Sequence, residues 1–230
     1  METYARIKRM TATKRVFHWT IAISTVVCVV TGLYIGSPYY MTDFATPAVY
    51  KYVMAYNRLA HLICAILLDV VAMASIYLFF FSRFKKAYKK ILPTAENFQE
   101  FFAVLFNLLT LNRTKKFDSK QADSYNMIFF LILEILLLLQ MATGFQLYVG
   151  SLSGNTSIGA WWPWLLHATT DWTSVLFGGI MGVRITHHLL MWVIICWAMS
   201  HIYYQVWRTI FWQEGDIAIA FGGDKFVRKS

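Results

Sequence analysis

The chain has 230 residues, of which 58% are hydrophobic, 17% aromatic and only 14% charged. Soluble domains carry about 25% charged residues, so this composition excludes an ordinary soluble domain, and the many aromatic residues exclude a disordered chain. The three cysteines lie far apart in apolar runs and form no C-x-x-C-H motif, which excludes a small disulfide scaffold and covalent c-type haem attachment.

Four segments are long and apolar enough to cross a bilayer, whose hydrocarbon core needs about 20 helical residues. In chain order they are residues 16–36, 59–82, 125–149 and 181–207. The first is too long for a cleaved signal peptide and no A-x-A-like site follows it, so we expect it to remain as a permanent span. The sequence therefore predicts an all-α integral membrane protein, with one four-transmembrane-helix domain over residues 1–230.

Lysine and arginine are distributed unevenly between the ends of these spans. Eighteen of the 21 lie in the N-terminal arm, the connection after the second span or the C-terminal tail, and the others are Lys51, Arg58 and Arg184. The positive-inside rule then predicts that both termini and the loop 83–124 are cytoplasmic and that the segment 150–180 is periplasmic. The net charge of +9 follows from this topology, and we expect no nucleic-acid partner.

Two further apolar stretches are too polar or too interrupted to be predicted as spans. Residues 94–111 mix Glu96, Glu100 and Asn107 with Phe and Leu, which predicts a helix lying in the cytoplasmic membrane interface against lipid. Residues 156–180 carry four tryptophans, which are typical of an interfacial belt and equally suit a docking face for a partner.

Five of the six histidines lie in or beside the spans, where polar side chains are costly and indicate function. His187 and His201 are fourteen residues apart, and fourteen helical residues advance about 21 Å and stop about 40° short of four full turns. They therefore share one face at two depths, whereas His188 lies on another face. His61 shares the outer depth with His187, and His18 shares the inner depth with His201.

Two histidine pairs at two depths predict two b-type haems, because helix bundles build cofactor sites from facing helices. The outer haem is expected between His61 and His187, and the inner haem between His18 and His201. A structural zinc or copper site would need more ligands gathered at one depth. His167 and His188 are more simply interpreted as interhelical hydrogen-bonding residues.

Arginines recur beside these histidines. Arg15, Arg58 and Arg184 each lie three residues before a paired histidine, and Arg208 returns to the same face seven residues after His201. Arginine binds carboxylates such as haem propionates, although arginines at these depths are equally suited to anchor a helix at the interface. Gly32, fourteen residues after His18, offers room for a macrocycle at the outer level, although glycine is common in membrane helices.

Several motifs, taken in chain order, resemble the b-type cytochrome subunit of membrane-bound nickel–iron uptake hydrogenases. They are R-V-F-H-W-T with V-T-G-L-Y-I-G, N-R-L-A-H, T-G-F-Q-L-Y, and H-H-L-L-M-W with H-I-Y. The related gamma subunit of formate dehydrogenase shares the plan. The resemblance implies a di-haem anchor in the bacterial cytoplasmic (inner) membrane, with haem ligands at the family's four positions, here His18, His61, His187 and His201.

The resemblance also implies partners and a direction of electron flow. Electrons would come from a periplasmic hydrogenase, whose large subunit holds nickel and iron, through the iron–sulfur clusters of its small subunit. They would pass to the outer haem, the inner haem and then a membrane quinone, either menaquinone or ubiquinone. The hydrogen chemistry would lie on the partner subunits, so no catalytic residue is expected on this chain.

The quinone site is left open, because the chain departs from the family pattern there. Family members often carry Asn-Pro and then Gln before the third span, where this chain reads D-S-Y-N-M over residues 123–127, and a family arginine in the second span corresponds to Ser75. Gln121, Asp123 and Asn126 are candidates to bond or protonate the quinone, or simply to cap the helix. Two acids at mid-depth, Asp69 and Glu134, either relay protons or stay protonated and bonded to a neighbouring helix.

Three other functions remain open from sequence. The partner could be a formate dehydrogenase or another periplasmic oxidoreductase, and the chain could be a structural anchor with one haem or none. A proton or ion transporter using Asp69 and Glu134, with histidines as relay groups, is the more distant alternative, and it would show no b-type spectrum.

Overall fold

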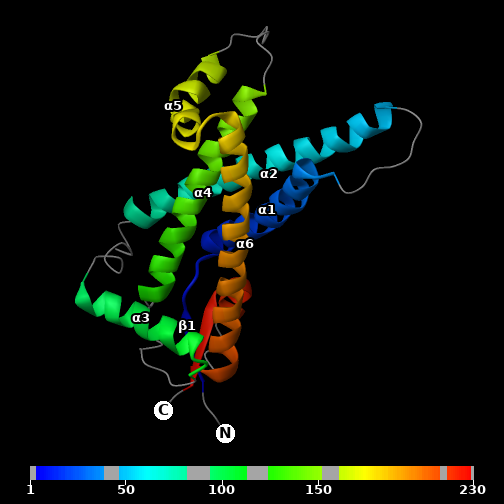
Figure 1. Ribbon diagram of the computed structural model, residues 1–230. Helices are drawn as coiled ribbons and strands as arrows, with labels where there is room; N and C mark the ends of the chain where they lie inside the picture. The colour runs from blue at the N-terminus through cyan, green and yellow to red at the C-terminus, as the bar shows by residue number, and fades with distance from the viewer. Residues whose placement is uncertain are drawn as a thin grey trace. The chain divides into compact units, whose positions relative to one another are not determined.

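A computed structural model describes residues 4–38, 47–81, 94–112, 124–151, 161–212 and 217–228. Four of its helices are long and apolar: α1 (Ala12–Gly36), α2 (Pro47–Phe81), α4 (Ser124–Gly150) and α6 (Ile180–Phe211), which Figure 1 labels along the chain. By length and composition, the helical segments that could cross a membrane are Ala12–Gly36, Tyr52–Phe81, Ser124–Gly150 and Ile180–Phe211. The predicted four-helix membrane fold is therefore confirmed.

The helices are longer than the apolar runs that predicted them, most of all α2, which begins at Pro47 rather than near residue 59. Proline suits the first position of a helix, where its missing N–H group is not needed. A hydropathy window marks only the part of a helix that fits the hydrocarbon core, whereas the helix continues into the polar interface.

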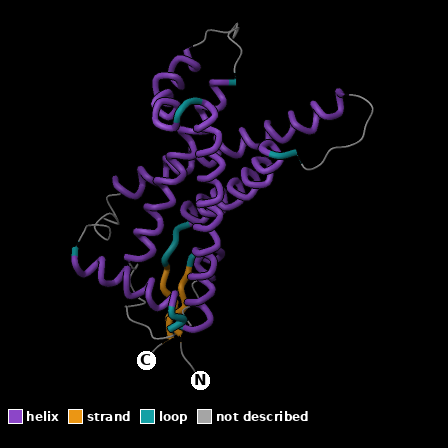
Figure 2. The backbone as a smooth tube through the Cα atoms, in the orientation of Figure 1, coloured by secondary structure: helices purple, strands orange, loops and turns teal. Residues whose placement is uncertain are grey.

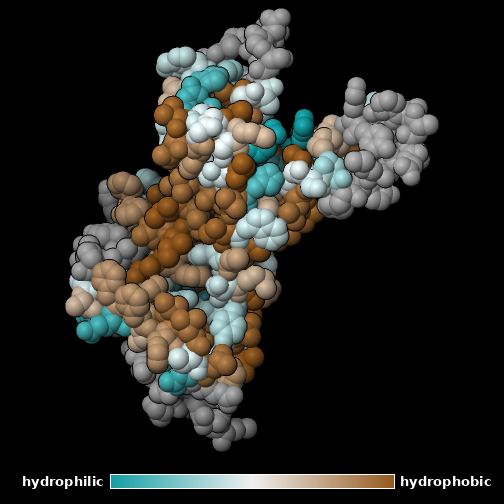
Figure 3. Space-filling model, viewed as in Figure 1, coloured by the Kyte–Doolittle hydropathy of each residue, from teal (hydrophilic) through white to brown (hydrophobic). Residues whose placement is uncertain are grey.

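Polar and apolar side chains are distributed in the opposite sense to a soluble protein. Large apolar residues point outward along the long helices, for example Val26, Val70 and Met199, each more than half exposed. The buried positions include Thr143 and Gln146, and brown hydrophobic side chains cover much of the face seen in Figure 3. Outward apolar and inward polar residues suit a lipid environment, which offers no hydrogen bonds to polar groups.

The chain divides into two compact units, each containing part of all four long helices. We call residues 1–23, 70–134 and 197–230 the terminal unit, because it contains both chain ends. Residues 24–69 and 135–196 form the second unit, which we call the α5 unit after the helix α5 (Trp161–Phe177).

In the terminal unit the two chain ends form a small antiparallel sheet, the orange strands of Figure 2. Strand β1 (Tyr4–Lys8) pairs with β2 (Asp224–Arg228), and Arg6 forms an ion pair with Asp224, which raises the pKa of the Arg6 guanidinium. Helix α7 (Ile217–Gly222) leads into β2 through Gly223, whose φ of +83° suits glycine. The Gly223 carbonyl accepts the N–H groups of Arg9 and Met10, which ties the N-terminal arm to the tail.

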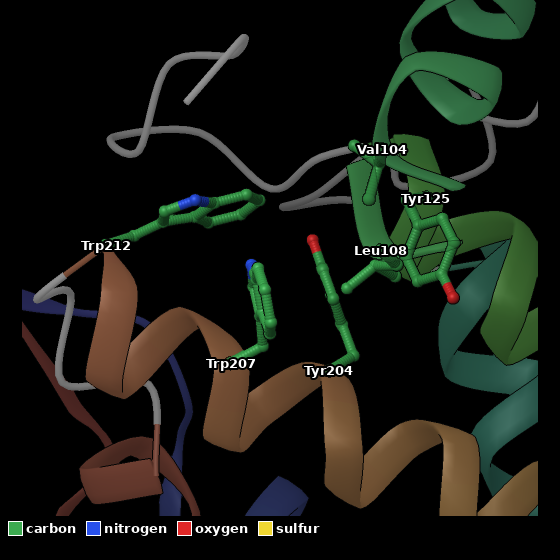
Figure 4. Packing of buried hydrophobic residues seen from close by; sticks show 6 residues of the cluster. All are labelled: Val104, Leu108, Tyr125, Tyr204, Trp207 and Trp212. Carbon is green, nitrogen blue, oxygen red and sulfur yellow. The ribbon is translucent and has the colours of Figure 1, made fainter. Parts of the chain in front are cut away.

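The terminal unit also contains α3 (Ala95–Leu109), which begins after an N-cap threonine, Thr94, that accepts the N–H of Asn97. One face of α3 packs onto aromatic residues at the beginning of α4 and the end of α6, in a cluster formed by Val104, Leu108, Tyr125, Tyr204, Trp207 and Trp212 (Figure 4). The other face exposes Phe98, Phe102, Phe106 and Leu109. Helix α3 is therefore amphipathic, as a helix in the membrane interface must be, and its interfacial position stays a prediction.

In the α5 unit, α5 is joined to α4 by side-chain hydrogen bonds centred on Gln146. Its amide oxygen accepts the Thr170 hydroxyl at 2.8 Å, and its amide nitrogen donates to Ser174 at 2.9 Å. Gly178 and Gly179 then turn the chain into α6, both with positive φ. The segment predicted from its tryptophans thus contains a helix, which exposes Trp164 and Trp172.

Candidate functional site

The structure brings the four predicted ligand histidines together as two pairs, one in each unit. The rings of His18 and His201, in the terminal unit, have centres 6.4 Å apart and planes inclined by 50°. The rings of His61 and His187, in the α5 unit, also have centres 6.4 Å apart, with planes inclined by 62°. Each pair joins two different long helices, α1 with α6 and α2 with α6.

This separation fits one metal ion held between two imidazoles. A metal–imidazole nitrogen bond is about 2.0 Å long and the ring centre lies roughly 1.2 Å behind the nitrogen, so two opposed rings have centres about 6.4 Å apart. Across the described parts of the chain, no three His, Cys, Asp or Glu side chains gather as a metal site of their own. Two imidazoles are the protein ligands that a bis-histidine haem requires.

His187 is held by two side chains of α4. Its Nδ1 lies 2.9 Å from the hydroxyl oxygen of Thr143, and its Nε2 lies 3.1 Å from the amide nitrogen of Gln140. The Thr143 hydroxyl also lies 2.8 Å from the carbonyl oxygen of Leu139, one turn earlier in the same helix. Because Gln140 and a metal would need the same Nε2 lone pair, the Gln140 side chain must turn away where a metal is bound.

His61 has the same kind of partner on α1. Its Nδ1 lies 2.9 Å from the hydroxyl oxygen of Thr31, which lies 2.6 Å from the carbonyl oxygen of Val27. In both cases the threonine is followed by a glycine, Gly32 or Gly144, that faces the same ring. A Cβ atom on either glycine would lie 3.2 Å from Cε1 of the neighbouring histidine. Gly32, predicted to make room for a macrocycle, makes room in this structure for the ring of His61.

The His18–His201 pair is surrounded by aromatic rings instead. Trp197 stacks on His201 with centres 5.3 Å apart and planes within 6°, and its Nε1 donates to the Phe129 carbonyl at 3.0 Å. His18 meets Trp19 edge to face at 5.5 Å. The Nδ1 of His18 is buried and has no hydrogen-bond partner among the described residues.

The four predicted arginines have different surroundings. Arg15 donates to the carbonyl of Phe221 at 2.9 Å, whereas the side chains of Arg58 and Arg184 are exposed. Arg208 is buried, donates to the Tyr204 hydroxyl at 3.1 Å and lies over the rings of Tyr204 and Trp212. The structure thus places Arg208 in the aromatic cluster against α3, and a propionate role for it stays a prediction.

Of the candidates for quinone and proton chemistry, Gln121 and Asp123 lie outside the described residues. Asn126 is half-buried near the beginning of α4, and its side-chain oxygen lies 3.4 Å from the amide nitrogen of Gln205. Glu134 is 3% exposed, and neither carboxyl oxygen has a hydrogen-bond partner in the described parts of the chain. A buried carboxyl group of this kind is costly unless it stays protonated or finds a partner.

The remaining acid and histidines belong to neither ring pair. Asp69 and Ser75 are half-buried on α2. His167 is exposed on α5 and bonds Asp171 at 2.9 Å. His188 bonds the backbone carbonyl of Arg184 at 3.1 Å and lies against Gly36, as expected for a residue on a different face from His187. The bonds of His167 and His188 both lie within the residue's own helix, so the prediction that these histidines bond between helices is wrong for the contacts that the structure describes.

Sequence reasoning missed the side chains that hold the paired histidines. Thr31, Thr143 and Gln140 were not predicted, nor was Gln205 beside Asn126. One signal was available, because Thr-Gly occurs in the first and the third span and in each case on a helix that neighbours a ligand helix. The contact itself depends on helix packing, which the sequence pattern does not specify.

A membrane helix bundle with two histidine pairs of this spacing is typical of membrane-bound b-type cytochromes. Residues 9–223 match the profile of the prokaryotic cytochrome b561 family. The chain belongs to this family, which implies b-type haem, and with its four apolar helices it is a multi-pass protein of the bacterial inner membrane.

Three proteins that are similar in sequence to this chain share the same description. The chain is 26% identical over 211 residues to a protein of Azotobacter vinelandii and 27% identical over 211 residues to one of Azotobacter chroococcum mcd 1, covering in both cases 91% of this chain and 84% of the relative. It is 26% identical over 231 residues to a protein of Rhodobacter capsulatus, covering 92% of this chain and 78% of the relative. Each of these relatives is described as a probable Ni/Fe-hydrogenase B-type cytochrome subunit.

Proposed function

We propose that this chain is the di-haem cytochrome b subunit of a membrane-bound nickel–iron hydrogenase. It would carry electrons from hydrogen oxidation in the periplasm to a membrane quinone. The observation that carries the proposal is the presence of two histidine pairs with the same 6.4 Å ring separation, in a chain of the cytochrome b561 family. The description of its relatives supports hydrogenase as the partner.

The protein's own residues would hold two b-type haems. His61 and His187 would bind one iron and His18 and His201 the other, each through a ring nitrogen. A bound haem iron supplies one-electron oxidation and reduction, while the protein sets its potential through axial ligands, nearby charges and burial. The arginines three residues before these ligands, Arg15, Arg58 and Arg184, would bind propionates.

The side of the membrane follows from charge. Eighteen of the 21 lysines and arginines lie in the termini or the connection after α2, so these would face the cytoplasm. The His61–His187 pair would then be the outer site, closer to the periplasmic small and large hydrogenase subunits. The His18–His201 pair would be the inner site.

A quinone would be reduced beside the inner pair. Two electrons arriving one at a time and two protons taken from the cytoplasmic side convert one quinone, menaquinone or ubiquinone, into one quinol. Asn126 and Gln205 offer amide groups within the same unit as the inner pair, and Glu134 offers a buried carboxyl group that could pass a proton. Gln121 and Asp123 remain candidates from the sequence.

Hydrogen-dependent quinone reduction in membranes tests this function. We expect His61→Ala to abolish quinone reduction by hydrogen but to leave hydrogen oxidation with a soluble artificial acceptor intact. The matched control is His167→Ala, which removes an exposed histidine of the same unit and should leave both activities unchanged. Equal loss of both activities in His61→Ala would contradict a role in electron transfer.

A further inference from the structure

The α5 unit contains one arrangement twice. Thr31-Gly32 on α1 faces His61 on α2, and Thr143-Gly144 on α4 faces His187 on α6. The distance from threonine Oγ1 to histidine Nδ1 is 2.9 Å in both places, and the position of a Cβ atom on either glycine lies 3.2 Å from histidine Cε1. Two unrelated contacts would not be expected to agree in both distances.

The proton in each threonine–histidine contact has a defined direction. Each hydroxyl has a single proton, and the carbonyl of Val27 or Leu139 lies 2.6 or 2.8 Å away on the threonine's own helix, where it accepts that proton. The hydroxyl oxygen must then accept from the histidine, so Nδ1 of both rings carries the hydrogen. The other ring nitrogen, Nε2, then carries no hydrogen and presents its lone pair.

A second contact at His187 supports the same tautomer. The amide nitrogen of Gln140 is a donor only, and it lies 3.1 Å from Nε2 of His187. With the amide group in this orientation, the contact agrees with an Nε2 atom that carries no hydrogen. This is the atom that a metal ion would need.

Glycine follows each threonine for a steric reason. The two rings lie against the helix backbone at Gly32 and Gly144, where a side chain would press on Cε1. The absence of a side chain lets the helix come close enough for the preceding threonine to reach Nδ1. In each Thr-Gly pair, the glycine allows the histidine ring to approach the helix, and the threonine bonds that ring.

We propose that Thr31 and Thr143 are positioning residues that fix both ligands of the outer haem as Nδ1-protonated tautomers, with Nε2 directed to the iron. This inference rests on the proposed function of the His61–His187 pair. A hydroxyl that accepts Nδ1–H makes the ligand more electron-donating and stabilises ferric iron, which lowers the potential of that haem. The inner pair differs, because Nδ1 of His18 has no partner among the described residues and His201 stacks on Trp197.

The test replaces the threonine hydroxyl by a methyl group, which changes the shape of the side chain very little. The full chain is purified together with its haems for each measurement. The variants are Thr31→Val and Thr143→Val, with Thr31→Ser and Thr143→Ser retaining the hydroxyl. Thr169→Val on α5 is the matched control, because its hydroxyl bonds only backbone carbonyls of its own helix among the contacts that the structure describes. The readouts are haem per chain, the two midpoint potentials and the ferric low-spin signals in electron paramagnetic resonance.

We expect each valine variant to raise one of the two midpoint potentials, to shift one of the two ferric signals and to weaken haem retention at that site about 10- to 100-fold. The serine variants and Thr169→Val should match the wild type. If a valine variant does not accumulate, the alanine variant is compared with the serine variant in its place.

Unmoved potentials and signals in the valine variants would overturn the proposal, as would equal shifts at both haems. A serine variant that shifts as much as valine would show that packing, not the hydroxyl, matters, and would also overturn it. A wild-type chain with fewer than two haems would contradict the proposed function and this inference together. A wild type with two haems and unaffected threonine variants would contradict this inference only.

Discussion

Replacement of Gly32 by valine gives the most direct structural perturbation of the outer histidine pair. A Cβ atom there would lie 3.2 Å from Cε1 of His61 and 3.8 Å from Sδ of Met191. Carbon atoms prefer about 3.5–4.0 Å, so the first contact is already tight, and the two further methyl groups of valine would overlap the ring. The ring cannot turn freely, because its Nδ1 is bonded to Thr31 at 2.9 Å.

The energies favour displacement of the ring. Inserting extra carbon atoms into a packed site costs about 1–3 kcal/mol. Replacing glycine inside a helix returns about 0.5–1 kcal/mol, and less for a β-branched residue. The net penalty is therefore at most about 2.5 kcal/mol, and we expect displacement of the His61 ring from Gly32 to relieve it.

Haem per chain, measured on purified protein, is the assay. We expect Gly32→Val to retain one haem rather than two, with the inner haem unchanged. Gly222→Val is the control, because a Cβ atom at Gly222 meets nothing within 4 Å. Two haems with unaltered spectra in Gly32→Val would refute the view that this glycine is needed for the His61 ring.

Three further predictions address other parts of the chain. Trp197→Leu removes the ring stacked on His201 and should shift only the inner haem signal, so a shift of the outer signal would contradict the pairing. Glu134→Leu should raise the melting temperature, because an unpaired buried polar group costs about 1–3 kcal/mol, and should slow quinone reduction; a lower melting temperature would show that the carboxyl group has a partner. Asp224→Asn should leave the melting temperature nearly unchanged, because the Arg6 side chain of this ion pair is 72% exposed to water, although Asp224 is only 13% exposed, and a fall of several degrees would contradict this.

The long helices could be predicted from sequence because hydropathy over about 20 residues is a local signal. The histidine pairing could also be predicted, because a fourteen-residue separation fixes face and depth on one helix whatever surrounds it. The residues at which the helices begin and end could be predicted less accurately. The beginning of α2 at Pro47 lies in a segment where Tyr, Lys and Asn interrupt the apolar run.

The parts that could not be predicted depend on contacts between distant segments. Strands β1 and β2 are five residues each and pair across almost the whole chain, so no local turn signals them. Arg208 shares a helical face with His201, yet stacking on Tyr204 and Trp212 holds its guanidinium within the cluster against α3. The threonine partners of His61 and His187 depend in the same way on which helix packs beside each ligand.

The haem content of the purified wild-type chain, with its reduced-minus-oxidised spectrum, tests the central claim most directly. Two b-type haems per chain, reduced to one by His61→Ala and likewise by His201→Ala, is the predicted result. A chain without b-type absorption, or one that keeps both haems when either histidine is removed, would contradict the assignment of the two pairs.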